Sequence, residues 1–307
     1  MLIAIDHGNK QIKTVHCPPF VSGLTQSATE PYGKDILKYK DLYYTLSDQR
    51  IPYHKDKSED DRFFILTLFA IAGEIEAEGC YEKGLINIQL AIGVPPAYYG
   101  SQGKALVNYF KDRPVVQFMY GQKRYAIYIE DVRCYPQAYA AAATLLQSLV
   151  ESPRALILDI GGHTADYIVM KNGKPNFNSL QSCSSLENGV DVFYNRTRAI
   201  LNAEKDILLE ESEIDAILKG NATAYPAEAI QIVRQQAQEF VNDLFSTLRE
   251  RQIELRSSKV VFVGGGSILL RRQIEESGKI GTPMFVNDIN ANARGYEFLY
   301  KLEGTGR

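Results

Sequence analysis

Apolar residues in this chain follow two patterns, which predict two kinds of element. Short, nearly continuous apolar runs bounded by turn residues are typical of strands buried in a sheet. Longer segments carry apolar residues three to four positions apart, as amphipathic helices do. Strands are expected at 2–5, 11–17, 86–92, 115–119, 125–129, 155–170 (as a hairpin) and within 259–270, where the strand ends in three glycines. Helices are expected at 61–78, 102–110, from Pro136 through an alanine-rich run, 190–201, 211–218, 227–251 and 290–302.

Strands and helices therefore alternate along the chain, which predicts an α/β fold. The tyrosine-rich stretch that ends near Tyr53 is expected to be mostly loop. A similar strand-turn-strand segment occurs twice, with Asp6 near the end of one strand and Asp159 near the end of the other, about half the chain apart. This long repeat suggests two topologically related halves, each of which opens with a hairpin.

Both hairpins turn at glycine, and a third strand runs into three glycines before a helix. Gly8, Gly161 and Gly162 give the backbone the freedom to point N–H groups at a polyphosphate, which requires many donors and little side-chain bulk. Asp6 and Asp159 would reach the water shell of a magnesium ion, which keeps most of its waters in proteins. Each turn alone is a weak signal, but the order of all three predicts a phosphate clamp.

Composition limits the classes of function. The formal net charge of −3 and the pI near 5.9 argue against direct binding to nucleic acid, which requires a basic surface. The four cysteines form no C-x-x-C pair, so we expect reduced thiols rather than a zinc site or a disulfide framework. No apolar run approaches the ~20 residues of a membrane span, and the first residues resemble a strand rather than a signal peptide. We expect a cytoplasmic protein without membrane contact.

Six segments resemble the superfamily of actin, sugar kinases and heat-shock chaperone ATPases, and most closely its ParM branch of plasmid-segregating bacterial actins. IDHGNKQIK and LDIGGHTADYIVM are similar to the two phosphate loops, and VFVGGGSILL is similar to the adenosine loop. The other resemblances are AIGVPPAYYGSQGK, SLENGVDVFYNRTRAIL and the closing NDINANARGYEFLYK. The resemblance therefore covers nearly the whole chain.

This resemblance implies an actin-like, ribonuclease H-like fold of two domains with the nucleotide in the cleft between them. Domain I would be residues 1–148, with a C-terminal helix at 289–307 packed back on it, and domain II would be residues 149–288. The implied activity is hydrolysis of ATP, or of GTP, with Mg²⁺, coupled to the assembly of a filament of identical subunits. The implied partner is a ParR-like DNA-binding adaptor on a centromere-like plasmid site.

The resemblance also assigns residues. Asp6 and Asp159 would serve in catalysis and hold the metal, largely through water, and Gln137 would be the third catalytic residue. Nucleotide-binding residues are expected in the first loop (Gly8, Asn9, Lys10, Gln11 and Lys13), in the second loop (Gly161, Gly162, His163 and Thr164), beside the ribose (Glu187, Gly189 and Asp191) and in the adenosine loop (Gly264, Gly265, Gly266 and Ser267). Lys13 is expected to contact the phosphates rather than to be an ordinary solvated strand lysine.

Gln137 departs from the ParM pattern, which has a glutamate at the start of this helix. A carboxylate can take a proton from the attacking water, whereas an amide can only orient it. We therefore expect slow hydrolysis that depends on positioning, unless Gln137 is an ordinary residue of a helix cap. His7 and His163 are as compatible with solvent-facing turn residues as with phosphate contacts. Asp166 is equally compatible with a further carboxylate near the metal, besides Asp6 and Asp159, and with a solvated strand residue.

Two other functions remain open. A bacterial cytoskeletal actin that sets cell shape or positions an organelle would share these loops. A small-molecule kinase of the same fold would also require an aspartate base facing a substrate pocket, and the sequence offers no motif for one.

Overall fold

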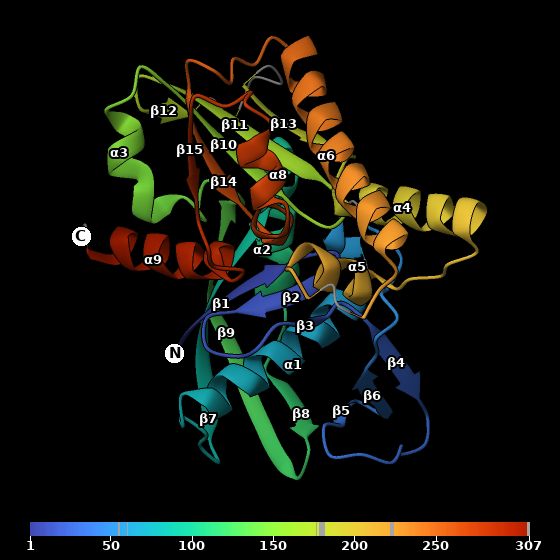
Figure 1. The fold of residues 1–307 in the computed structure, drawn as a ribbon. Helices are drawn as coiled ribbons and strands as arrows, with labels where there is room; N and C mark the ends of the chain where they lie inside the picture. The colour runs from blue at the N-terminus through green and yellow to red at the C-terminus, as the bar shows by residue number, and fades with distance from the viewer. Residues whose placement is uncertain (55, 60, 176, 178–181, 222–223, 306–307) are drawn as a thin grey trace. The chain divides into compact units, whose positions relative to one another are not determined.

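The computed structural model describes the whole chain except residues 55, 60, 176, 178–181, 222–223 and 306–307 (Figure 1). The chain divides into two compact units. Unit 1 comprises residues 1–143 and 290–307, and unit 2 comprises residues 144–289. Each unit contains a β-sheet with helices packed against it, so the α/β class predicted from the alternating pattern is confirmed.

In the described residues, the sheet of unit 1 has nine strands in the order β3-β2-β1-β7-β9-β8-β5-β6-β4. Three of them, β1, β7 and β9, run parallel at its centre, and the outer strands pair antiparallel. The strands are β1 (Leu2–His7), β2 (Gln11–Thr14), β3 (Phe20–Val21), β4 (Leu24–Ser27), β5 (Leu37–Tyr39), β6 (Leu42–Leu46), β7 (Leu85–Val94), β8 (Val116–Tyr120) and β9 (Lys123–Pro136).

Successive residues of β1 pack on opposite faces of this sheet. Ile5 belongs to a large core with α1 and α2, whereas Ala4 belongs to a smaller core with Tyr296 of α9. Glycine lets α9 lie close to the strands, because a Cβ at Gly93 would be only 2.1 Å from the Tyr296 hydroxyl oxygen. The helical segments of unit 1 are η1 (Lys57–Glu59), α1 (Asp61–Ala77), η2 (Pro96–Tyr98), α2 (Tyr99–Lys111), η3 (Ala143–Leu145, whose last two residues belong to unit 2) and α9 (Ala291–Thr305).

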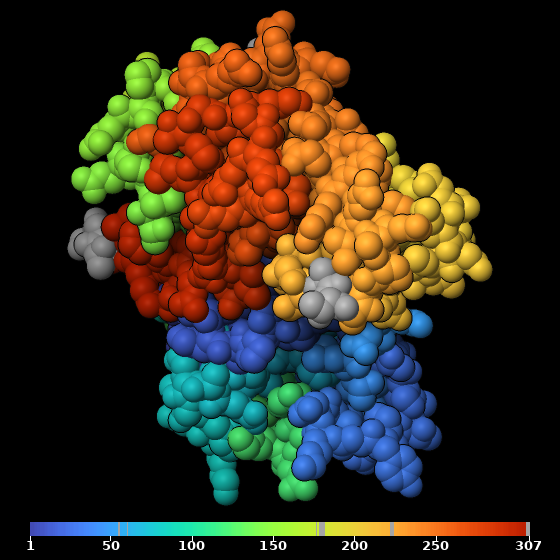
Figure 2. All heavy atoms as spheres, in the orientation of Figure 1, coloured from blue at the N-terminus to red at the C-terminus, as the bar shows by residue number. Residues whose placement is uncertain are grey.

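The sheet of unit 2 follows the order β12-β11-β10-β14-β15, and β13 pairs with β11. Its core joins the sheet to α4 and α6 through residues such as Phe193, Leu244 and Phe262. The other face of α6 is exposed, and the helix is visible at the surface (Figure 2). The elements are β10 (Arg154–Ile160), β11 (Ala165–Lys171), β12 (Lys174–Pro175), β13 (Cys183–Leu186), β14 (Lys259–Val263), β15 (Thr282–Phe285), α3 (Leu146–Val150), α4 (Val190–Lys205), α5 (Glu211–Leu218), α6 (Ala227–Glu250), α7 (Gly265–Leu269) and α8 (Arg271–Glu276).

Two expectations from the sequence were wrong. The tyrosine-rich stretch expected to be mostly loop contains the four short strands β3 to β6. The helix expected to begin at Pro136 does not form there, because β9 continues to Pro136 and Ala138 takes a left-handed conformation with φ of 61°. The Ala138 N–H donates instead to Oδ1 of Asn292, at 3.0 Å. Helical structure begins only at η3 and continues in α3.

Along the described residues, no helix is long and apolar enough to cross a bilayer.

Candidate functional site

The first candidate loop joins β1 to β2 in unit 1. Asp6 on β1 lies directly opposite Lys13 on β2, so the two residues are neighbours on one face of the sheet. The turn begins with a hydrogen bond from the Gly8 N–H to the Asp6 carbonyl, at 3.0 Å. Gly8 is required here, because a Cβ would lie 2.6 Å from the carbonyl oxygen of Gln11. The two sides of the turn therefore lie close together, and no side chain at position 8 covers the backbone.

Carbonyl groups of this turn are held from inside the protein by Ser22. The Ser22 hydroxyl donates to the carbonyl of Gly8 at 2.6 Å, and its backbone N–H donates to the carbonyl of Lys10 at 3.2 Å. In a trans peptide the N–H points away from the preceding carbonyl, so the Asn9 N–H is directed away from Ser22. Ser22 was not identified from the sequence, because a serine that follows a two-residue strand carries no motif.

Gln137 lies beside Asp6. It follows β9 directly, and its N–H donates to the Val94 carbonyl at 2.9 Å, which extends the pairing of β9 with β7 by one residue. Its side-chain Nε2 donates to Oδ1 of Asp6 at 2.9 Å, and both side chains are buried. The structure therefore brings together Asp6, Gln137 and, across the strand pair, Lys13.

His7 does not have either of the roles considered for it. It is neither a solvent-facing turn residue nor a phosphate contact, because it is 1% exposed and its ring stacks on Phe110. Thr67 donates its hydroxyl proton to the Phe63 carbonyl and lies 2.7 Å from His7 Nε2, so Nε2 carries the proton. Burial, with the nearby charge of Lys57, lowers the pKa of His7 to about 3. His7 therefore stays neutral and structural.

The second candidate loop joins β10 to β11 in unit 2. Asp159 pairs with Asp166 across the hairpin, and both are less than a tenth exposed. The Gly161 N–H closes the turn by donating to the Thr164 carbonyl at 2.9 Å, and the Thr164 hydroxyl donates to Oδ2 of Asp166 at 3.2 Å. Asp166 therefore does not face solvent, which excludes the interpretation that it is a solvated strand residue.

The amino end of α4 fixes the direction of this turn. The N–H groups of Gly189, Val190 and Asp191 donate to the carbonyls of His163, Gly161 and Gly162, at 3.0, 3.0 and 2.8 Å respectively. All three carbonyls therefore point toward α4. Because each N–H of a trans peptide points away from the preceding carbonyl, the N–H groups of residues 162–164 point away from α4. Three backbone donors on one side of a turn form a concave site suited to an anion.

Gly189 and Asp191 thus support the loop through their backbone, whereas the sequence suggested contacts to a ribose. A Cβ at Gly189 would lie 2.4 Å from the Gly162 carbonyl oxygen, so only glycine fits. The Asp191 side chain lies 4.0 Å from Nδ1 of His163, and Glu187 is exposed. That the side chains of Asp191 and Glu187 contact the nucleotide stays a prediction.

The third glycine loop packs against the end of β10. Gly264 has a φ of 87°, and a Cβ there would lie 2.1 Å from Oδ1 of Asp159. A Cβ at Gly266 would lie 2.6 Å from Cγ2 of Ile160, whereas Gly265 is exposed with open space around it. Ser267 is fully buried, and its hydroxyl has no hydrogen-bond partner among the described residues. The structure therefore joins Asp159 to the glycine backbone of this loop and leaves the Ser267 side chain inside the protein.

Two models of actin-like protein families match the sequence. A model of the actin-like proteins' N-terminal domain matches residues 40–139, and a model of the C-terminal part of the archaeal MreB-like actin homologue matches residues 157–276. No functionally curated protein has a significant match to the sequence.

Solved structures of actin-like proteins have the same fold over nearly the whole chain. The archaeal actin homologue Ta0583 has a TM-score of 0.79 and 17% identity, covering 98% of this chain and 99% of its own. The actin-like protein Alp7A has a TM-score of 0.78 and 15% identity, covering 100% and 98%. The apo pSK41 ParM protein has a TM-score of 0.73 and 14% identity, covering 99% and 98%.

The TM-scores establish the fold, whereas identities this low do not show to which branch of the actin-like proteins the chain is most similar. The two family models lie in different units, one in unit 1 and one in unit 2. The fold predicted from the sequence is thereby confirmed: this chain has the two-domain α/β fold of actin-like proteins.

Proposed function

We propose that this protein binds ATP or GTP with Mg²⁺ and hydrolyses it slowly. The observation that carries the proposal is the same construction at Asp6 and at Asp159. Each is a buried aspartate near the end of a central strand, followed by a glycine turn whose carbonyls are held from within the protein. The backbone N–H groups directed the other way would bind phosphate oxygens. The archaeal homologue Ta0583 forms a complex with ADP, which supports this role.

The residues present fit a magnesium ion. Gln137 holds one oxygen of Asp6, and the other oxygen, Oδ2, makes no hydrogen bond to the described residues. Gly264 lies so close to Oδ1 of Asp159 that no side chain fits between them. Aspartates that reach the ion mainly through water suit magnesium, which retains its water shell. The bound ion would offset phosphate charge.

Gln137 would orient the attacking water. Its Nε2 donates to Asp6, which directs the acceptor oxygen Oε1 away from the carboxylate, since two acceptors do not pair. That oxygen can accept a hydrogen bond from a water but cannot take its proton, so hydrolysis would depend on positioning. Lys13, opposite Asp6, would contribute positive charge for the phosphates.

We further propose that the nucleotide-bound protein assembles into filaments that move plasmid DNA through a basic ParR-like adaptor. A filament structure is known for the related Alp12, and pSK41 ParM shares the fold. The net charge of −3 leaves little attraction for DNA by the chain alone, so an adaptor would supply the contact.

Sedimentation tests the nucleotide and filament steps together. The purified chain should pellet with ATP or GTP, or with a non-hydrolysable analogue, and should stay in the supernatant without nucleotide. Asp159→Asn, which keeps the size of the side chain but removes its charge, should lose magnesium-dependent hydrolysis, whereas the exposed Asp112→Asn should not. Phosphorylation of a sugar without any polymer would instead establish a small-molecule kinase.

DNA binding separates the partition role from other filament roles. Alone, the chain should bind DNA weakly and lose it at moderate salt, and preformed filaments should associate with DNA only when a basic adaptor is added. Tight, salt-resistant binding by the chain alone would contradict the adaptor model. Filaments that bundle without any adaptor would favour a cell-shape or organelle-positioning actin.

A further inference from the structure

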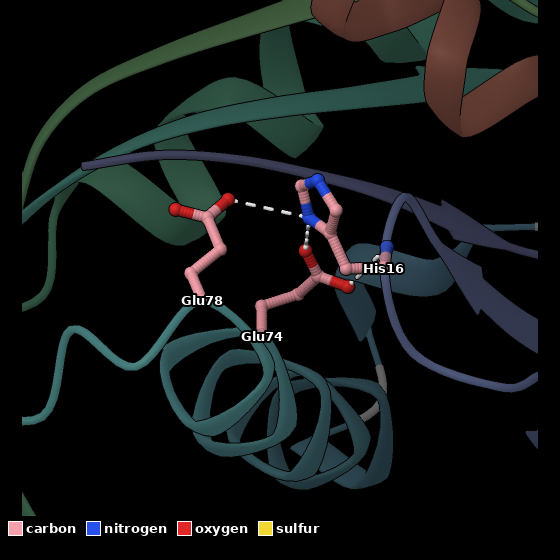
Figure 3. Close-up of side chains that lie close together, drawn as sticks. All are labelled: His16, Glu74 and Glu78. Atoms are coloured by element: carbon pink, nitrogen blue, oxygen red, sulfur yellow. Dashed lines mark hydrogen bonds and ion pairs between the residues drawn. The ribbon is translucent and has the colours of Figure 1, made fainter.

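A second cluster of ionisable groups lies in unit 1, at the carboxyl end of α1. His16, two residues after β2, directs Nδ1 at two carboxylates: Oε2 of Glu74 at 2.8 Å and Oε1 of Glu78 at 3.2 Å. Figure 3 shows the three side chains converging, with Glu74 on α1 and Glu78 just beyond its end. The ligand atoms of all three lie within 4.8 Å of one another.

The buried member of the cluster is held in a fixed orientation. Glu74 is 1% exposed, and its Oε1 accepts hydrogen bonds from the backbone N–H groups of His16 and Cys17 at 2.8 and 2.9 Å. These two bonds occupy one oxygen and turn the other, Oε2, toward the imidazole. Metal ligands are oriented in the same way by hydrogen bonds to their remaining atoms.

The cluster has more negative charge than its protein neighbours balance. Glu76 on the same helix is paired with Lys123 at 2.9 Å, but within the described residues neither Glu74 nor Glu78 forms an ion pair with a lysine or arginine. The helix has no basic residue in its last turn, where the negative end of the helix dipole favours cations. A single imidazole faces two carboxylates, and a divalent cation would balance both.

We propose that His16, Glu74 and Glu78 bind a divalent transition-metal ion, with Zn²⁺ as the best match. One imidazole and two carboxylates suit zinc, whereas magnesium prefers oxygen ligands and water. In a tetrahedral zinc site with bonds of about 2.0–2.1 Å, ligand atoms lie roughly 3.3 Å apart. The separations of 2.8 and 3.2 Å between the imidazole and the two carboxylates therefore need to open only slightly, and the two carboxylate oxygens lie within 4.8 Å of each other. Water would complete the coordination, and the ion would fasten the returning strand of the first loop to α1.

Zinc titration of the untagged, nucleotide-free chain tests this proposal, after treatment with EDTA and dialysis. Isothermal titration calorimetry should show one saturable zinc site per chain in the wild type. His16→Ala and Glu78→Gln remove one ligand each from partly exposed positions, so both variants should fold. Each should weaken zinc binding at least about tenfold. Glu76→Gln is the matched control, because it removes the same charge from the last turn of α1, two residues from Glu78 and outside the cluster, and it should bind zinc as the wild type does.

Thermal unfolding gives an independent readout. Added zinc should raise the midpoint of the wild type and of Glu76→Gln, because a ligand that binds only the folded state stabilises it. It should leave the midpoint of His16→Ala unchanged. The proposal is wrong if no saturable binding occurs up to about 100 μM zinc, a concentration at which a site of ordinary affinity would be filled. It is also wrong if Glu76→Gln weakens binding as much as Glu78→Gln, since general acidity of the surface would then explain the binding.

Discussion

Nε2 of Gln137 donates a hydrogen bond to Oδ1 of Asp6 at 2.9 Å, although 131 residues separate the two in the sequence. The end of β9 and the end of β1 bring them together, with β7 between the two strands. The bond fixes the amide so that its oxygen faces away from the carboxylate. A glutamate at this position would place its carboxylate within hydrogen-bonding distance of the Asp6 carboxylate, and the two negative charges would repel each other. Glutamine avoids this repulsion.

Gln137→Ala should slow nucleotide hydrolysis by roughly tenfold to a hundredfold, because the attacking water loses its orienting acceptor. Nucleotide affinity should change little, and filaments should persist longer in sedimentation time courses. Phosphate release and binding of a fluorescent nucleotide measure the two effects separately. Gln122→Ala, at an exposed turn, is the control and should behave as the wild type. Loss of nucleotide binding in Gln137→Ala would instead mean that the residue is structural.

Two adjacent glycines should respond oppositely to alanine. Gly264→Ala would put an alanine with a φ of 87° beside Asp159, with its Cβ 2.1 Å from the carboxylate oxygen. We expect a loss of at least about 2 kcal/mol in the free energy of unfolding, from the backbone conformation and the steric clash. Gly265→Ala has open space and a helical backbone, so it should be neutral or stabilise by up to about 1 kcal/mol. Urea unfolding compares them, and equal losses would contradict the packing of this loop.

Asn292→Ala should destabilise unit 1, because the buried N–H of Ala138 would lose its acceptor. An unsatisfied buried donor costs about 1–3 kcal/mol. Asn292→Asp keeps an acceptor oxygen, and a negative charge in the first turn of α9 is favourable, so most of the stability should remain. Thermal unfolding of the two variants separates the hydrogen bond from side-chain volume. If both lose stability equally, the bond to Ala138 is not the cause.

The sequence predicted the three loops because glycines at tight turns and apolar runs before them are local features. Asp6 and Asp159 could be placed at strand ends for the same reason. The prediction of a helix from Pro136 was wrong because the helix propensity of alanine is a local property. The conformation of Ala138 depends on a hydrogen bond to Asn292, which is 154 residues away. Four short strands between 20 and 46 were also missed, since each is too brief to show a periodic pattern.

His7 shows the same limit at the level of a single side chain. Its place next to Gly8 suggests a turn residue, but it is still part of β1, and its side chain turns inward to Thr67 and Phe110. The roles of Ser22 and of the α4 amino end could not be predicted either. Both act through hydrogen bonds to backbone carbonyls of residues distant in the sequence, and no local motif marks such bonds.

The pKa of His7 makes the stability of the nucleotide-free protein depend on pH. Burial, helped by the charge of Lys57, lowers this pKa to about 3 in the folded state, against an ordinary value near 6.5 in the unfolded chain. The unfolded state therefore binds a proton between these values and the folded state does not. His7 should contribute its full stabilisation above pH 6.5, and that contribution should fall as the pH drops toward 3.

His7→Phe removes the titrating group and keeps an aromatic ring against Phe110. Between pH 6 and pH 5 the unfolding free energy of the wild type should fall more steeply than that of the variant. The difference should approach about 1.4 kcal/mol per pH unit, the value for one proton taken up on unfolding. Urea unfolding at half-unit steps of pH measures both slopes. Parallel slopes would mean that the folded protein protonates His7 as readily as the unfolded chain does, and would contradict its burial as a neutral side chain.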